Sequence, residues 1–174
     1  MKILIMSDTH TIPKSALIDI LNHIEYDHFI HCGDIYMNYT QGDLGLVQLV
    51  RGNNDFNDSP SQISTIIDQK KFFITHGHHY DIGFTMSTIQ EHCQGKYDVV
   101  CFGQSHIPLK EEINGTLYIN PGSLCYPRGR CIHPTYCILD SQTMEVTYYD
   151  KNHQVLDPFE QIASTSYFKR IFKF

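Results

Sequence analysis

Short apolar runs, each ended by a polar turn, most constrain what this chain can fold into. The run KILIMS at 2–7 precedes a stretch at 13–24 that begins with proline and repeats apolar residues at helical spacing. Further apolar runs follow at 28–34 and 46–55. Such alternation is typical of a β-α-β sheet whose strand ends carry functional loops. We therefore predict buried strands at the three runs and a helix over 13–24.

The second half of the chain has a different rhythm, with shorter strands and more turns. The segments QISTIID and KFFITHG flank a polar turn at Gln69–Lys70 and predict a hairpin. A helix is predicted over 84–94 and a strand over 98–103, followed by short strands around TLYIN, TYCILD and MEVTYYD. The fold class that follows is α/β, with two packed mixed β-sheets in a sandwich flanked by helices.

Composition and charge narrow the class of protein. The 174 residues are 41% hydrophobic and 18% charged, which is typical of one globular domain. The net charge of −6 argues against stable nucleic-acid binding, and no apolar run is long enough for a membrane span. The apolar N-terminal run is too short for a signal peptide, and the six cysteines lack paired CxxC motifs. We expect reduced thiols and a cytoplasmic protein; a homo-oligomer is compatible with the sequence.

Five segments place side chains that ligate metals just after apolar runs: SDTH, CGD, GNND, THGHH and GQSH. A single Asp or His at a strand end is most often a cap or a hydrogen-bonded structural residue. Five in order are more informative, because the strand ends of an open α/β sheet converge on one crevice. Gly33 allows the sharp turn that brings Asp34 close. Mixed carboxylate, imidazole and amide donors favour manganese, iron or zinc over calcium.

Read in order, D-x-H, G-D, G-N-x-D, H-G-H and G-x-x-H resemble the calcineurin-like metallophosphoesterase superfamily. INPGSLCYPRG at 119–129 resembles the N-P-G-S…P-R segment of its small single-domain branch. That branch includes bacterial and archaeal phosphodiesterases and the retromer scaffold subunit. The resemblance implies a four-layer α/β/β/α domain over residues 1–150. The extension at 151–174 is expected to dock on the same domain, with a membrane or partner contact as the alternative for the tail.

The resemblance also implies a dinuclear metal site. The first ion would be held by Asp8, His10, Asp34 and His106. Asp34 would bridge to the second ion, whose remaining ligands would be Asn53, His76 and the residue at position 104. The family normally has histidine at that last position, whereas this chain has Gln104. Because an amide oxygen is a weaker ligand than imidazole, we predict a weakened and partly occupied second site. Mn²⁺ is the expected ion, with Fe, Zn, Ni or Mg²⁺ as alternatives.

The function implied is a metal-dependent phosphodiesterase that hydrolyses a small soluble phosphodiester through a metal-bound hydroxide. Many superfamily members have, at the position of Asn54, a histidine that protonates the leaving group, and an amide cannot do this. Asn54 and Arg128 are predicted to bind substrate, and Asp55 to orient its loop. The predicted catalytic residues are Asp34, Asn53, Asn54 and His76.

The alternative function is a non-catalytic binding or scaffold protein that retains the metallophosphoesterase fold. Gln104 and Asn54 favour it, whereas the otherwise intact set of ligands favours the enzyme. A serine or cysteine hydrolase is a distant third, because no GxSxG motif is present.

Overall fold

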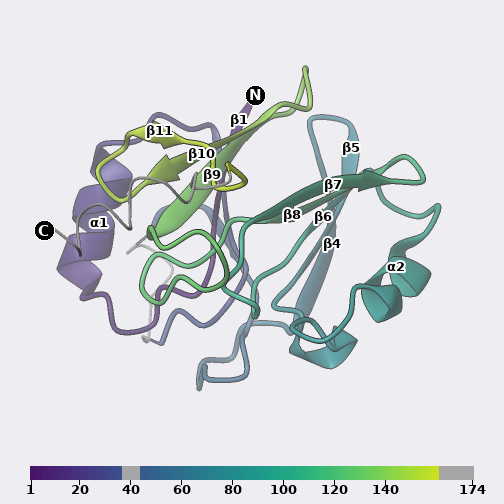
Figure 1. Cartoon of the computed structure of the whole chain (residues 1–174), viewed down its shortest axis with the longest axis horizontal. Coiled ribbons are helices and arrows are strands. Elements are labelled where there is room, and N and C mark those ends of the chain that lie inside the picture. The colour runs from purple at the N-terminus through teal and green to yellow at the C-terminus, as the bar shows by residue number, and fades with distance from the viewer. Residues whose placement is uncertain (37–43, 161–174) are drawn as a thin grey trace, which may run out of the picture.

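The computed structural model describes residues 1–36 and 44–160, which form two face-to-face β-sheets with one helix outside each sheet (Figure 1). The first sheet has the strand order β11-β10-β9-β1-β2-β3 and the second has the order β4-β5-β6-β8-β7. The strands of the first sheet are β1 (Lys2–Met6), β2 (His28–His31), β3 (Val47–Leu49), β9 (Thr135–Asp140), β10 (Val146–Asp150) and β11 (Val155–Leu156). Those of the second are β4 (Gln62–Ile67), β5 (Lys70–Thr75), β6 (Val99–Cys101), β7 (Leu109–Ile113) and β8 (Thr116–Asn120). The helices are α1 (Lys14–Asn22), α2 (Ser87–Cys93) and the short 3₁₀ turn η1 (His78–Tyr80).

Three apolar clusters separate the four layers. Ile5 of β1 and Ile74 of β5 belong to the cluster between the two sheets. On the outer face of the first sheet, Leu4 of β1 packs in one cluster with Leu17 of α1. On the outer face of the second, Phe73 of β5 packs with residues of α2. Each central strand is therefore apolar on both faces, which explains its unbroken apolar sequence. The predicted two-sheet α/β sandwich is confirmed.

Strand direction places the functional loops. In the first sheet β1, β2 and β3 run parallel, and in the second sheet β5, β6 and β8 run parallel. The other pairings are antiparallel, so both sheets are mixed, as predicted. The five predicted ligand segments follow the carboxyl ends of β1, β2, β3, β5 and β6. Parallel strands therefore deliver all five segments toward one region between the sheets.

Several predicted boundaries were too wide. The strand predicted over 28–34 ends at His31, and the one predicted over 46–55 covers only Val47–Leu49. The first ends early because Gly33 and Asp34 have positive φ angles, which an extended strand does not accommodate. The helices are shorter than the predicted 13–24 and 84–94, at Lys14–Asn22 and Ser87–Cys93. The strand predicted over 2–7 ends at Met6, and the one over 98–103 covers only Val99–Cys101.

Two further differences concern a turn and a strand of the second sheet. The first hairpin turns at Asp68–Gln69, not at Gln69–Lys70, and both turn residues have positive φ. Strand β7 was not predicted, because its sequence LKEEI is largely polar and only its two end residues are half-buried.

Among the described helices, none is long and apolar enough to cross a membrane.

The chain beyond residue 150 begins by packing on the first sheet. Val155 and Leu156 of β11 pair with β10, and the Phe159 ring lies edge-on to Tyr148 at 5.4 Å. Residues 161–174, which include the predicted docking tail, lie outside the described residues. The domain limits predicted at residue 150 stay a prediction.

Candidate metal centre

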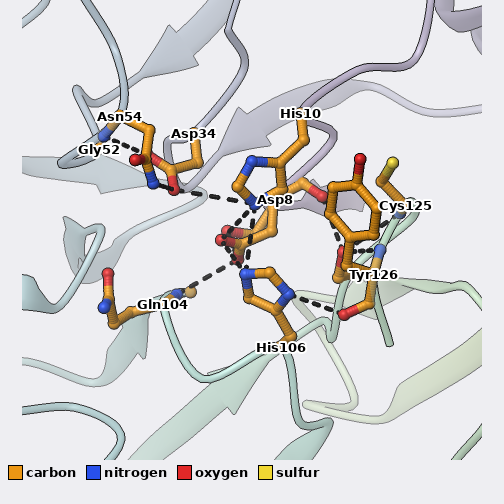
Figure 2. Close-up of polar contacts among 12 residues, drawn as sticks. Asp8, His10, Asp34, Gly52, Asn54, Gln104, His106, Cys125 and Tyr126 are labelled. Atoms are coloured by element: carbon orange, nitrogen blue, oxygen red, sulfur yellow. Dashed lines mark hydrogen bonds and ion pairs between the residues drawn. The ribbon is translucent and has the colours of Figure 1, made fainter. Parts of the chain in front are cut away.

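Two carboxylates and three imidazoles meet where the loops of the two sheets converge: those of Asp8, Asp34, His10, His76 and His106. Figure 2 shows four of these residues, Asp8, Asp34, His10 and His106. Asp8 Oδ1 lies 3.1 Å from His106 Nε2, 3.7 Å from His10 Nε2 and 3.9 Å from His76 Nε2. Asp34 Oδ2 lies 3.5 Å from His76 Nε2 and 3.8 Å from His10 Nε2. Two groups have ligand atoms mutually within 4.8 Å: Asp8–His10–His106 and Asp8–Asp34–His76. All five side chains are buried.

The donor atoms of this cluster fit a divalent cation. Asp8 Oδ1 and His76 Nε2 are buried without a hydrogen-bond partner, which is costly unless an ion or water satisfies them. The Nδ1 atoms of His76 and His106 lie 2.8 and 2.7 Å from the carbonyl oxygens of Cys32 and Tyr126. Since a carbonyl only accepts, each Nδ1 carries a proton and donates it. Each Nε2 is thereby left as a lone-pair donor facing the centre, the usual support for a metal-ligating histidine.

Burial and neighbouring groups shift the pKa values of two members of the cluster, Asp8 and His106. Burial alone would raise the pKa of Asp8, but contacts with His10, His106 and His76 outweigh it and hold that pKa well below its usual range. Burial would lower the pKa of His106, whereas the Asp8 carboxylate and the Tyr126 carbonyl together raise it on balance. Each of these two shifts favours the charged form of its group. A bound cation would also stabilise the Asp8 carboxylate, and its ligation by His106 would require an unprotonated Nε2.

Backbone strain is concentrated at this centre. Twelve non-glycine residues of the described chain have positive φ, and six of them belong to the cluster or lie beside it: Asp8, His10, Asp34, Tyr36, Gln104 and His106. Each such residue costs about 1–2 kcal/mol, so the surrounding structure must hold it in place. Backbone hydrogen bonds join the loops directly, from Asp8 N–H to Gly33 O and from His10 N–H to Asp34 O, each 3.0 Å.

Two glycines allow the loops to approach one another. A side chain at Gly52 would collide with the Asp34 carboxylate, and one at Gly103 would collide with Ser7 Oγ and reach Asp8 Oδ2 at 2.7 Å. Any larger residue at either position would displace a carboxylate of the cluster. The glycines before Asn53 and Gln104 are therefore packing requirements of the site.

Asp55 has the loop-orienting contacts expected of it. Its Oδ2 accepts the N–H groups of Asp34 and Gly52, both at 2.8 Å, and its Oδ1 accepts that of Tyr36 at 2.7 Å. One buried carboxylate thus ties the loop after β2 to the loop after β3.

The N-P-G-S segment has a comparable role, which the sequence did not reveal. Asn120 Nδ2 donates to Gly103 O at 2.8 Å and to Ser105 Oγ at 3.0 Å. Ser123 Oγ donates to Asp8 O at 2.8 Å. The segment therefore binds two ligand loops to each other rather than facing open solvent. No spacing in the sequence predicts contacts between residues more than a hundred positions apart.

The remaining predicted site residues line a cavity of about 350 Å³ above the cluster, together with His10, Asp34 and His106. Asn53 is exposed on its wall, whereas Asn54 contacts Asp34 twice: its N–H donates to Oδ1 at 2.9 Å and its Nδ2 to Oδ2 at 2.6 Å. Gln104 donates its backbone N–H to Asp8 Oδ2 at 3.2 Å, and its side chain lies apart from those of Asp8 and His106 (Figure 2). Arg128 is exposed on the same wall.

A model of the calcineurin-like phosphoesterase superfamily domain matches residues 1–144. The chain belongs to this superfamily. The probable metallophosphoesterase YsnB of Bacillus subtilis is 34% identical over 87% of this chain and 92% of its own length. Phosphodiesterase MJ0936 of Methanocaldococcus jannaschii is 36% identical over 83% and 96%. The predicted family and the predicted enzyme class, a metal-dependent phosphoesterase, are confirmed.

Solved structures agree on the fold. A predicted phosphoesterase from Streptococcus pneumoniae superimposes with a TM-score of 0.81 at 25% identity, covering 89% of this chain and 92% of that one. A Vps29 single mutant from Entamoeba histolytica has a TM-score of 0.68 at 22% identity, covering 86% and 91%. The second likeness shows the fold alone.

Proposed function

We propose that this protein is a phosphodiesterase that hydrolyses small soluble phosphodiesters at a centre of two divalent ions, the second held weakly. The observation that carries the proposal is the pair of ligand groups sharing Asp8 beneath a cavity of about 350 Å³. Such a cavity suits a small molecule. The archaeal relative MJ0936 is a phosphodiesterase, which supports the same substrate class.

In this proposal the first ion is held by Asp8, His10, Asp34 and His106. The second is held by Asp34, Asn53, His76 and, weakly, Gln104. The position of Asp34 Oδ2, within 3.8 Å of His10 and 3.5 Å of His76, supports a bridging role. When bound, such ions activate water and polarise the phosphoryl oxygens, and Mn²⁺ suits this donor set.

The chain itself orients these groups and contacts the substrate. Cys32 O and Tyr126 O accept the Nδ1 protons of His76 and His106, which keeps both Nε2 atoms free for ligation. The exposed guanidinium of Arg128, at the cavity wall, is suited to a phosphate oxygen. The amide protons of Asn54 are not acidic enough to be transferred to a leaving group. We therefore propose substrates whose leaving groups depart as stable anions.

Two features weaken the binding of the second ion. Gln104 replaces an imidazole with an amide, whose side chain lies apart from the cluster in Figure 2. Asn54 Nδ2, at 2.6 Å, already occupies the Asp34 oxygen that would bridge the ions. A second cation must therefore compete with this hydrogen bond for Asp34.

The test is reconstitution with metal. The protein is stripped with chelator and given Mn²⁺, and hydrolysis of bis(p-nitrophenyl) phosphate is measured for the wild type, Asp34→Ala and Asp19→Ala. Asp19 is a matched control, since its side chain is 75% exposed on α1. We expect manganese-dependent turnover in the wild type and Asp19→Ala, lost by orders of magnitude in Asp34→Ala.

The same assay discriminates the alternative, a binding or scaffold protein. The Asn54 contact, which satisfies Asp34 without an ion, favours that alternative. Folded, manganese-loaded protein without turnover above Asp34→Ala would refute the phosphodiesterase. A cytoplasmic location, the absence of stable nucleic-acid binding and any homo-oligomer stay predictions.

A further inference from the structure

We propose that Tyr36 and Tyr126 form an aromatic subsite beside the metal centre, which binds a planar aromatic group on one ester arm of the substrate. The inference rests on the proposed phosphodiesterase function and narrows its substrates to aryl or nucleoside phosphodiesters. The shared chemistry is a flat π-system next to a phosphate.

The two tyrosines are placed where a substrate arm would lie. Both line the cavity above the cluster, and both rings pack beside the His10 imidazole, with centroids 5.7 Å away for Tyr36 and 5.3 Å for Tyr126. Yet Tyr36 is 50% exposed and Tyr126 is 49% exposed. Shielding His10 would not by itself require this open surface. Half-exposed tyrosines at a cavity are suited to stacking a flat group while the hydroxyl remains wet.

Tyr126 is also held in a fixed position. Its hydroxyl hydrogen-bonds Thr11 Oγ1 at 3.0 Å, and its N–H donates to Ser123 Oγ at 2.8 Å. Its carbonyl accepts the Nδ1 proton of His106 at 2.7 Å. The ring is therefore tied to the ligand loops on both sides. A ring positioned in advance loses little conformational entropy when a ligand stacks on it.

Arg128 places a positive charge beside the aromatic subsite. It lines the same cavity, two residues beyond Tyr126, and its backbone N–H donates to His106 O at 3.1 Å. Within the described residues no carboxylate forms a salt bridge with it. A phosphate between Arg128 and the cluster would leave its second ester arm within reach of Tyr126. The cavity of about 350 Å³ suits a single nucleotide-sized molecule rather than a polymer.

The first test compares two diesters that share a leaving group, phenyl p-nitrophenyl phosphate and methyl p-nitrophenyl phosphate. The readout is the ratio of their kcat/KM values, in which changes common to both substrates cancel. We expect Tyr126→Leu to lower the phenyl-to-methyl ratio roughly tenfold, and Tyr126→Phe, which keeps the ring, to preserve it. Phe84→Leu is the control, because Phe84 is 97% exposed and does not line the cavity. An unchanged ratio in Tyr126→Leu would overturn the inference.

A second test does not depend on turnover. Calorimetry on manganese-loaded protein compares the affinities for phenyl phosphate and methyl phosphate, in the wild type and in Tyr36→Leu and Tyr126→Leu. We expect phenyl phosphate to bind roughly tenfold more tightly in the wild type and the preference to shrink in both variants. Equal affinities in the wild type would refute the subsite, even if diesters are hydrolysed. Intact preference without hydrolysis of either diester would instead refute the phosphodiesterase and leave an aromatic phosphate-binding site.

Discussion

Replacing Asp55 by asparagine is expected to destabilise the protein and loosen the metal centre together. The Asp55 carboxylate accepts three backbone N–H groups at 2.7–2.8 Å and is only 8% exposed. Asparagine keeps one acceptor oxygen and turns an NH₂ group toward a backbone donor. One charge-assisted hydrogen bond is lost and the other two weaken. At about 1.5–3 kcal/mol for a hydrogen bond to a charged group, Asp55→Asn should lower the free energy of unfolding by about 3 kcal/mol.

Urea denaturation of the metal-free protein measures this effect. With a slope of about 2 kcal/mol per molar urea, the midpoint should fall by about 1.5 M. Asp58→Asn is the matched control, because Asp58 lies on the same loop and is exposed. Asp55→Asn should also bind Mn²⁺ more weakly, since Asp34 is held through its own N–H by this carboxylate. Equal midpoints for the two variants would show that the three contacts do not hold the loops.

Three further outcomes follow from the site. Gln104→His should raise bound Mn²⁺, measured by elemental analysis, from about one toward two ions per chain, while the surface change Gln94→His should not. Gly103→Ala should cost about 1–3 kcal/mol by urea denaturation, because its Cβ meets Ser7 and Asp8; unchanged stability would contradict the packing argument. Burial lowers the pKa of His31 to about 4, so between pH 6.5 and 4 the unfolded chain binds the extra proton. Stability should therefore rise by about 3 kcal/mol as pH rises through that window, and His31→Gln should flatten this part of the profile.

Sequence patterns predicted the fold well where the signal was local. Buried strands such as β1 and β6 appear as unbroken apolar runs, because both their faces are covered. The predicted strand ends were wrong where the chain leaves the sheet in a left-handed conformation, as at Gly33 and Asp34. The missed strand β7 had a usable signal in the Asn114–Gly115 turn, whose positive φ angles suit a two-residue hairpin.

The sequence by itself determined the family and the order of the five predicted ligand segments, and it places glutamine at position 104, where the resemblance implies histidine. These are properties of short stretches, since each ligand must directly follow its own strand. Only the tertiary structure decided that Asn54 donates to Asp34, that Ser123 holds Asp8 and that Tyr36 and Tyr126 flank His10. These contacts join residues 20 to 116 positions apart. They exist because parallel strands of two different sheets end at the same place, and no local spacing encodes that meeting.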